Sequence, residues 1–253
     1  MGEGKKEVTP FDVRVEDRGG VRVLTLHRPE KLNAFTADGY RRLAALLEEA
    51  AADDEVAVGV LTGAGRAFSS GVDMNEMRRP GGSAELGVQF DPLLRTLARF
   101  PKPLLAAVNG LAVGFGATIL LHCDIVVVDQ DAEIRLPFIA LGTAAEAGSS
   151  WLLPRRVGHQ EAARLVLSGS PLGADEAVAR GFAHSKAPSG QALEETLDLA
   201  GQIARHRVPA LVANKSLLRA GWAAQVETVW QHEKAVMASL ADQLGQFGWP
   251  EPR

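Results

Sequence analysis

The sequence has a single cysteine and no strong excess of charge of either sign. Cys123 cannot form an internal disulfide, and its apolar neighbours predict a reduced, buried thiol. The formal net charge is -4 and the isoelectric point is near 5.9, which argues against non-specific binding of nucleic acids. The histidines show no metal-ligand spacing, so we expect no metal site.

Long hydrophobic runs and targeting segments are also lacking. The most apolar stretch, residues 103–128, is interrupted by Asn109, three glycines and Asp124, which argues against a membrane span. No apolar segment follows the basic pair in the first twelve residues, so no secretory signal is visible. We therefore expect a cytoplasmic protein without a membrane or nucleic-acid partner. Its 253 residues can form one large domain, alone or with a smaller appendage.

Strand and helix patterns alternate through the first three quarters of the chain. Residues 11–17 and 21–26 predict a hairpin, Thr36 can cap a helix that runs to about Ala52, and apolar runs predict buried strands. These runs cover 56–61, 104–108 and 125–128. The alternation favours an α/β fold with a largely parallel sheet.

Other segments are predicted less directly from their composition. The breaker-rich residues 78–85 predict a loop before a helix at about 90–100, and residues 117–123 predict a buried helix. Leu172-Gly173 fits a turn before a helix, and residues 181–183 fit a strand. From about residue 191 the pattern is helical, with segments near 209–219 and 223–244. We therefore divide the chain into a core, 1–190, and a helical C-terminal subdomain, 191–253.

Two glycine-bearing turns each precede an expected helix. One contains Asn109-Gly110 and then Gly114-Phe115-Gly116, and the other reads Ser69-Ser70-Gly71-Val72-Asp73. Glycine lets the backbone come close to a ligand, and the first N–H groups of a helix can stabilise charge on a carbonyl oxygen. The same residues also fit tight turns that only join packed core elements.

These two turns, followed by Cys123-Asp124, resemble the crotonase superfamily of enoyl-CoA hydratases and isomerases. The flanking segments agree, among them residues 28–34, 141–143 and 214–215. The resemblance implies an α/β fold of the crotonase (ClpP-like) type, a spiral of ββα units with a helical C-terminal subdomain. It also implies an acyl-CoA thioester substrate, with no separate cofactor because coenzyme A is part of that substrate. The tail of the family forms trimers, so we expect a homotrimer or a dimer of trimers.

Apolar residues in the tail support self-association, because they exceed what a small appendage can bury alone. They are Leu211, Leu217, Leu218, Trp222, Val226, Val229 and Trp230.

The resemblance implies that two backbone N–H groups, those of Val72 and Phe115, donate hydrogen bonds to the thioester oxygen. Phe115 replaces a glycine common in hydratases, which should narrow the acyl pocket and keep the donor. The resemblance also implies that residues of three segments bind coenzyme A. Asp73 also fits a helix cap, and the basic side chains among these residues also fit solvated surface charge. These residues are Arg28, Lys31, Leu32, Ala34, Ser70, Asp73, Met74 and Lys215, the last perhaps from a neighbouring subunit.

The acid/base residues decide which reaction follows. The two glutamates of family hydratases fall at Thr118 and Phe138, and neither residue can act as a base near neutral pH. Glu146 falls where peroxisomal-type Δ3,Δ2-enoyl-CoA isomerases of fatty acid metabolism keep their single catalytic glutamate. Glu146 also fits a solvated acid near a helix N-terminus. The resemblance thus favours an enoyl-CoA isomerase, with a hydratase or thioesterase and a catalytically silent acyl-CoA-binding protein as alternatives.

Overall fold

Two β-sheets organise the chain in this computed structural model, which describes residues 11–247. The larger sheet consists, in spatial order, of β1 (Asp12–Arg18), β2 (Val21–His27), β3 (Val58–Gly63), β5 (Leu104–Val108), β7 (Ile125–Asp129) and β10 (Ser185–Ala187). The smaller sheet consists of β4 (Ala67–Ser69), β6 (Leu111–Val113), β8 (Glu133–Arg135) and β9 (Leu172–Gly173).

The polypeptide passes repeatedly from the larger sheet to the smaller one and then into helices. β3 is followed by β4, β5 by β6, and β7 by β8, and each later strand pairs in parallel with its counterpart from the previous pass. Among the strands of residues 11–247, the β1–β2 and β8–β9 pairs are the antiparallel ones. This arrangement confirms the predicted α/β class and the spiral of ββα units.

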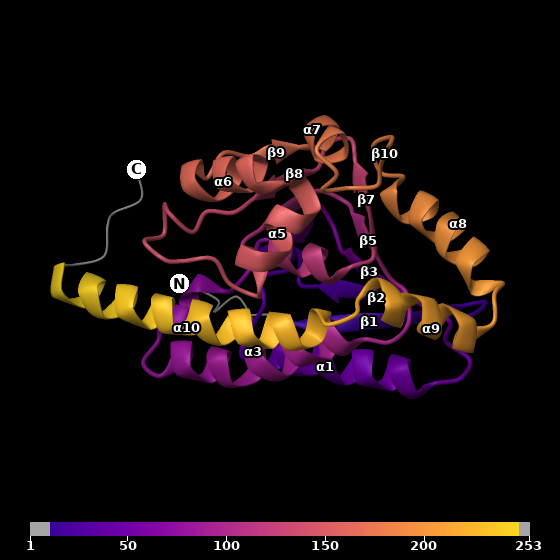
Figure 1. The fold of residues 1–253 in the computed structure, drawn as a ribbon, viewed down its shortest axis with the longest axis horizontal. Helices are drawn as coiled ribbons and strands as arrows, with labels where there is room; N and C mark the ends of the chain where they lie inside the picture. Colours follow the sequence, from indigo (N-terminus) through magenta and orange to yellow (C-terminus); the bar gives the residue numbers. More distant parts are fainter. Residues whose placement is uncertain (1–10, 248–253) are drawn as a thin grey trace, which may run out of the picture.

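Helices cover both faces of the larger sheet (Figure 1). They are α1 (Ala37–Ala52), α2 (Met74–Arg78), α3 (Gly82–Arg99), α4 (Phe115–Thr118), α5 (Ser149–Val157), α6 (His159–Ser168), α7 (Ala174–Ala179), α8 (Ala192–Ala204), α9 (Val208–Leu218) and α10 (Trp222–Phe247), with 3₁₀ turns η1 (Pro29–Lys31) and η2 (Ile119–His122). None of the helices within residues 11–247 combines the length and apolarity needed to cross a membrane.

The buried strands have two apolar faces, as expected for parallel strands covered by helices on both sides. Val60 and Leu105 belong to a cluster with Ala200 of α8, whereas Leu61 and Ala106 pack in the main core with residues of α1 and α3. Successive side chains of a strand point to opposite faces, so one run of apolar residues serves both layers.

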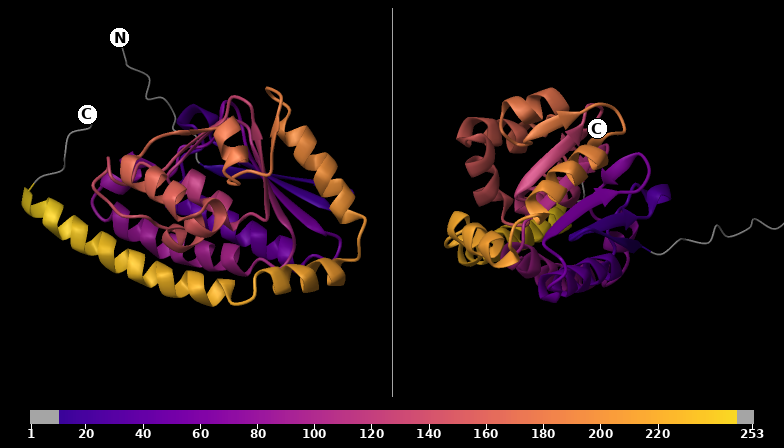
Figure 2. Two further views of the ribbon diagram at one scale, coloured as in Figure 1. Left: turned by 45° about the horizontal axis from the view of Figure 1, so that its top comes forward. Right: turned by 90° about the vertical axis from the view of Figure 1, so that its right-hand side faces the viewer.

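The helical tail divides between two places on the molecule. α8 packs against β3, β5 and β7, while α10 runs along α3 and reaches α5 (Figure 2). Thus the first helix of the expected C-terminal subdomain covers the sheet of the core, and the last one borders the second half of the spiral. The division at residue 190 stays a prediction.

Several local predictions are confirmed, and three are wrong. The hairpin forms, and Thr36 caps α1 by accepting a hydrogen bond from the Gly39 N–H at 3.0 Å. However, α3 begins at Gly82, because the Pro80-Gly81 breaker separates two helices and does not extend a loop; Gly81, at φ +77°, is the residue that precedes α3. β9 is a two-residue strand where a turn is predicted, and β10 begins at Ser185, later than the predicted 181–183.

Glycine at position 116 allows α4 to pack directly on the end of β4. A methyl group at Gly116 would overlap the Ser69 carbonyl oxygen, which lies on the backbone and cannot rotate away. The helix predicted at 117–123 therefore starts two residues earlier, at Phe115, and continues as the 3₁₀ turn η2.

We expect Gly116→Ala to lower the free energy of unfolding by about 1–3 kcal/mol, because the added methyl must push α4 away from β4. Gly87→Ala is the matched control, since a methyl group at this exposed position in α3 meets no atom within 4 Å. Alanine there should raise stability by about 0.5–1 kcal/mol through its helix propensity. Urea unfolding of both variants checks the opposite signs, and equal shifts would contradict this account.

Candidate active site

The turn after β4 touches the turn after β6. Gly71 has φ +88°, and a Cβ at this position would lie 2.7 Å from the Val113 carbonyl oxygen and 3.4 Å from the Phe115 nitrogen. Because β4 and β6 are parallel neighbours, their carboxyl ends meet at one edge of the smaller sheet. The two glycine turns identified in the sequence are therefore one backbone cluster in the fold.

Two N–H groups of this cluster are free. Val72 forms a bridge with Phe35, in which the hydrogen bonds are made by the flanking residues: the Phe35 N–H donates to Gly71 O at 2.7 Å and the Asp73 N–H donates to Phe35 O at 2.8 Å. Phe115 is the first residue of α4, whose first N–H groups have no partner in the helix. Within residues 11–247, neither the Val72 nor the Phe115 N–H donates a hydrogen bond.

The Phe115 side chain is part of an aromatic cluster in the core. Its ring makes edge contacts with Phe35, Tyr40 and Phe90 at centroid distances of 5.1, 5.3 and 4.8 Å. Only 4% of Phe115 is exposed, so the ring is committed to these neighbours. The residue that carries this free N–H group is therefore surrounded by aromatic side chains.

Glu146 is a half-buried carboxylate with one hydrogen-bond donor, the Thr118 hydroxyl, which lies 2.5 Å from its Oε1. Burial raises the pKa of Glu146 to about 8; the hydrogen bond from Thr118 acts in the opposite direction, and the negative charge of Glu233 adds to the rise. Glu146 in turn acts on Tyr40, whose pKa lies well above its usual range because of burial first and then the charges of Glu146 and Glu76. The carboxylate therefore lies near the aromatic cluster.

Thr118 makes a contact that its sequence position does not reveal. The sequence indicates only that it cannot act as a base, whereas its hydroxyl donates a hydrogen bond to Glu146. Phe138 is 3% exposed and lies in the main core. Thr118 is the last residue of α4, and nothing in the neighbouring sequence indicates a partner 28 residues away.

Most of the residues predicted to bind coenzyme A gather beside the two turns. The Ser70 N–H donates to Leu32 O at 2.9 Å, the Ala34 N–H donates to Lys31 O at 3.0 Å, and Met74 opens α2. The structure therefore brings the segment 28–34 and the segment 70–74 together.

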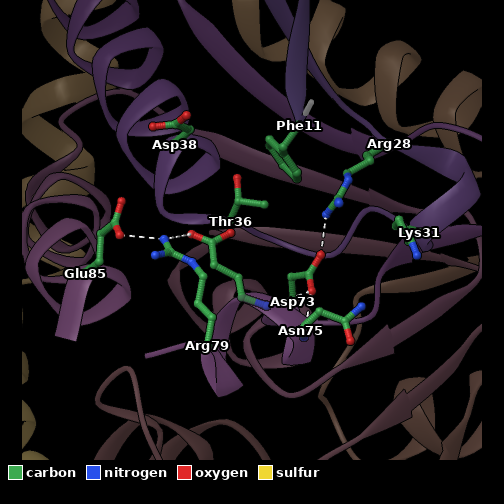
Figure 3. Close-up of a pocket in the computed structure, with 10 residues that line it drawn as sticks. Phe11, Arg28, Lys31, Thr36, Asp38, Asp73, Asn75, Arg79 and Glu85 are labelled. Carbon is green, nitrogen blue, oxygen red and sulfur yellow. Dashed lines mark hydrogen bonds and ion pairs between the residues drawn. The ribbon is translucent and has the colours of Figure 1, made fainter. Parts of the chain in front are cut away.

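A cleft of about 530 Å³ opens at this place, lined among others by Arg28, Lys31 and Asp73 (Figure 3). Arg28 Nη1 lies 2.6 Å from Asp73 Oδ2, and both side chains are buried. Burial opposes the ionisation of Asp73, but the hydrogen bonds from Arg28 and from two backbone N–H groups of α2 outweigh it, and its pKa is lowered. Asp73 is thus the helix cap that its sequence position predicts.

Lys215 has a different position from its predicted partners. It is 6% exposed, and its Nζ lies 2.8 Å from Asp124 Oδ2 and donates to the Lys102 carbonyl oxygen at 2.6 Å. Burial lowers the pKa of Lys215 to about 8, although the nearby Asp124 carboxylate opposes this shift. A contact with a coenzyme A phosphate would require Lys215 to leave this ion pair.

Comparison with known proteins identifies the family. The sequence profile of the enoyl-CoA hydratase/isomerase family matches residues 16–246, nearly the whole chain. The chain belongs to this family. The enoyl-CoA hydratase/isomerase family acts on acyl-CoA thioesters, and the chain is therefore an acyl-CoA enzyme with the crotonase fold.

Relatives within the family carry names of both reaction types. The chain is 41% identical to the 1,2-epoxyphenylacetyl-CoA isomerase of Escherichia coli over 74% of its own length and 72% of the relative. It is 38% identical to the 2,3-dehydroadipyl-CoA hydratase of the same organism, with 87% of each chain covered. The crystal structure of an enoyl-CoA hydratase/isomerase from Pseudoalteromonas atlantica aligns with a TM-score of 0.85 at 31% identity, covering 90% and 91% of the two chains.

The raised pKa of Glu146 predicts a specific dependence of stability on pH. In the folded protein Glu146 keeps its proton up to about pH 8. In the unfolded chain, where the pKa of a glutamate is 4.5, this proton has already been released. This contribution is fully present below the unfolded value and is lost as the pH rises through the folded one. Wild type should therefore lose stability relative to Glu146→Gln between about pH 5 and pH 8, by at most about 1.4 kcal/mol per pH unit. Urea unfolding at several pH values measures this difference, and parallel curves would contradict the assignment.

Proposed function

We propose that this protein moves a double bond of an enoyl-CoA from C3 to C2 through a thioester enolate, with Glu146 as its only acid/base residue. The observation that carries the proposal is the half-buried Glu146 carboxylate, whose pKa is raised to about 8 and whose hydrogen-bond donor is the neutral Thr118 hydroxyl. A base is most effective when its pKa lies near the working pH.

One carboxyl group is sufficient for this reaction. The base removes a proton from C2 of the substrate and returns it at C4, so no second residue and no water molecule takes part. The apolar surroundings of Phe115 help to keep water away from the intermediate. Thr118 and Phe138, which stand where family hydratases have their glutamates, contribute no acid or base at neutral pH.

The enolate needs hydrogen-bond donors for its oxygen. We assign this role to the Val72 and Phe115 N–H groups, which have no acceptor among residues 11–247 and belong to two turns in contact. Preorganised donors stabilise charge at the moment it develops, and the loss of one such donor costs roughly 3 kcal/mol of barrier. Coenzyme A would then lie along the cleft at Arg28 and Asp73, where the exposed ammonium group of Lys31 can reach a phosphate.

Hydration of an enoyl-CoA is the second candidate, because a relative of 38% identity is named 2,3-dehydroadipyl-CoA hydratase. Addition of water needs one group to activate the water and another to protonate C2. Glu146 could fill one of these roles, and Thr118 and Phe138 leave the other without a residue. The relative of 41% identity is named for the isomerisation of an epoxide, so the names of the relatives do not decide between the two candidates. The missing second acid/base residue favours the first candidate.

Two substrates separate the candidate functions. A 3-enoyl-CoA gains conjugated thioester absorbance if the protein isomerises it, whereas crotonyl-CoA loses this absorbance if the protein hydrates it. Efficient hydration of crotonyl-CoA would overturn the proposal. Tight binding of acyl-CoA without change in either substrate would indicate the catalytically silent protein.

We expect Glu146→Gln to retain acyl-CoA binding and to lose at least about a hundredfold in isomerisation, as is typical for the loss of a general base. In wild type, kcat/KM should rise with pH through about 8, because the base must be deprotonated to accept the C2 proton. Initial rates across this pH range measure both effects. Glu194→Gln, an exposed carboxylate of α8, is the matched control and should behave as wild type. Near-normal isomerisation by Glu146→Gln would show that another group is the base.

We also propose that the protein assembles as a homotrimer or a dimer of trimers through its tail. Val226 and Trp230 are buried within the subunit, whereas Leu217 and Leu218 of α9 remain 75% and 86% exposed. Two adjacent exposed leucines are unfavourable in water and suit a subunit contact.

The double variant Leu217→Asp/Leu218→Asp should therefore dissociate, while Val88→Asp, an exposed apolar position on α3, should not. Sedimentation at micromolar concentration measures the mass. A wild-type protein that sediments only as a 26.9 kDa monomer would exclude this proposal.

A further inference from the structure

The turn that carries Glu146 is fixed by three buried side chains, one for each of three consecutive residues. The Thr118 hydroxyl donates to Glu146 Oε1 at 2.5 Å, His122 Nε2 lies 2.8 Å from the Ala147 carbonyl oxygen, and the Gly148 N–H donates to Glu233 Oε2 at 2.7 Å. Because a carbonyl oxygen only accepts hydrogen bonds, Nε2 is the protonated nitrogen of His122. Two of these contacts hold the backbone of the turn, at Ala147 and Gly148, and the third holds the Glu146 side chain itself.

The backbone of the turn is in a conformation that needs such anchors. Ala147 has φ +59°, and Gly148 follows with φ +73°. An alanine rarely adopts the left-handed region unless its surroundings hold it there. The direction in which Glu146 points is therefore determined by the anchors as well as by the local sequence.

Glu233 is the anchor with the most contacts. Its carboxylate accepts hydrogen bonds from the Gly148 N–H, from the Ser150 N–H at 2.9 Å and from the Ser150 hydroxyl at 2.6 Å, and only 4% of the residue is exposed. These N–H groups belong to the first turn of α5, which has glycine at its N-cap and no side-chain cap of its own. A carboxylate from α10 thus supplies the cap that the α5 sequence lacks.

α10 is held firmly on either side of Glu233. Asp91 of α3 accepts hydrogen bonds from Trp230 Nε1 and from Lys234 Nζ, both at 2.7 Å, and the Trp230 ring packs on Phe90 at 5.0 Å. The ribbon of α10 lies along α3 and beside α5 in Figure 1. The position of Glu233 is therefore set by α3, not by the turn that it contacts.

We propose that Glu233 is a positioning residue, which from α10 fixes the Glu146–Ala147–Gly148 turn and thereby the direction of the Glu146 carboxylate. The inference rests on the proposed role of Glu146 in proton transfer. In this proposal α10 contributes to proton transfer through the turn, without contacting the substrate.

Glu233 also differs in charge from the other groups that face Glu146. Burial lowers the pKa of His122 to about 4 and, with nearby charges, keeps the pKa of Tyr40 well above its usual range, so both are neutral near pH 7. Burial raises the pKa of Glu233, and its three donors and the neighbouring His232 offset this rise only in part. The negative charge of Glu233 disfavours a second charge on Glu146, so its removal should lower the pKa of Glu146.

The test compares Glu233→Gln with Glu227→Gln. Glutamine keeps the size of the side chain but removes the charge and offers one acceptor oxygen in place of two. Glu227 is also on α10 and pairs with Arg95 of α3 at 3.2 Å, so its variant loses a carboxylate of this helix without touching the turn. Initial rates with a 3-enoyl-CoA between about pH 5 and pH 9 give kcat, KM and the pH midpoint of kcat/KM.

We expect Glu233→Gln to lower kcat roughly tenfold or more with little change in KM, because a small displacement of the base impairs proton transfer more than binding. The pH midpoint of kcat/KM should fall, and Glu227→Gln should leave all three quantities unchanged. A merely structural role would reduce stability and leave kcat unchanged, whereas the midpoint follows the lost charge in either case. An unchanged kcat in a folded Glu233→Gln protein would overturn the inference.

Two further measurements keep the inference testable. If Glu233→Gln does not fold, Ser150→Ala removes one of the three hydrogen bonds and no charge; it should lower kcat severalfold at constant KM, and an unchanged kcat would contradict the positioning role. If Glu146→Gln retains isomerisation, the proposed function is wrong, and the positioning role that rests on it is overturned as well. Loss of activity in Glu146→Gln with full activity in Glu233→Gln would refute only the positioning role.

Discussion

The arrangement of the site depends on how closely two backbone turns can approach each other. The turns after β4 and β6 touch because glycine stands at positions 71 and 116, where any side chain would collide with a carbonyl oxygen of the opposite turn. The parallel pairing of β4 with β6 brings both turns to one edge of the smaller sheet, and the bridge at Phe35 occupies the neighbours of Val72. Two N–H groups are thereby left without an internal partner, which is unusual for buried backbone and typical of places where a ligand supplies the acceptor.

A second constraint concerns the partners of the carboxylates near the site. The buried Asp73 is paired with Arg28, and the more exposed Asp124 is paired with Lys215 and Arg219, so each of these acids faces a cation. Glu146 instead receives one hydrogen bond from a neutral hydroxyl, with another carboxylate nearby. Against the effect of burial, the hydrogen bonds from Arg28 and from α2 lower the pKa of Asp73, whereas burial raises that of Glu146 to about 8. A pKa shifted toward neutral pH is the property that the proposed base requires.

Much of the fold and part of the site could be predicted from the sequence. Period-two and apolar runs predicted the strands of the larger sheet except β10, Thr36 predicted the start of α1, and the ordered glycine motifs indicated the family. Predictions failed where elements were too short to have a pattern, as in β9, or where a breaker separates two helices, as at Gly81. Thr118 and Glu233 have no local signal, because each acts through a contact with a residue 28 or more positions away. Lys215 was expected to bind a coenzyme A phosphate or to be a solvated surface cation, because its ion pair joins it to Asp124, a residue far away in the sequence.

The hydrogen bonds between Glu233 and α5 join residues that lie 83 and 85 positions apart. During translation, the strands of both sheets and the turns that bear Val72, Phe115 and Glu146 leave the ribosome before α10 does. The start of α5 therefore has no cap until α10 has been synthesised. The turn that bears Glu146 thus gains the Glu233 anchor only after both sheets have been made.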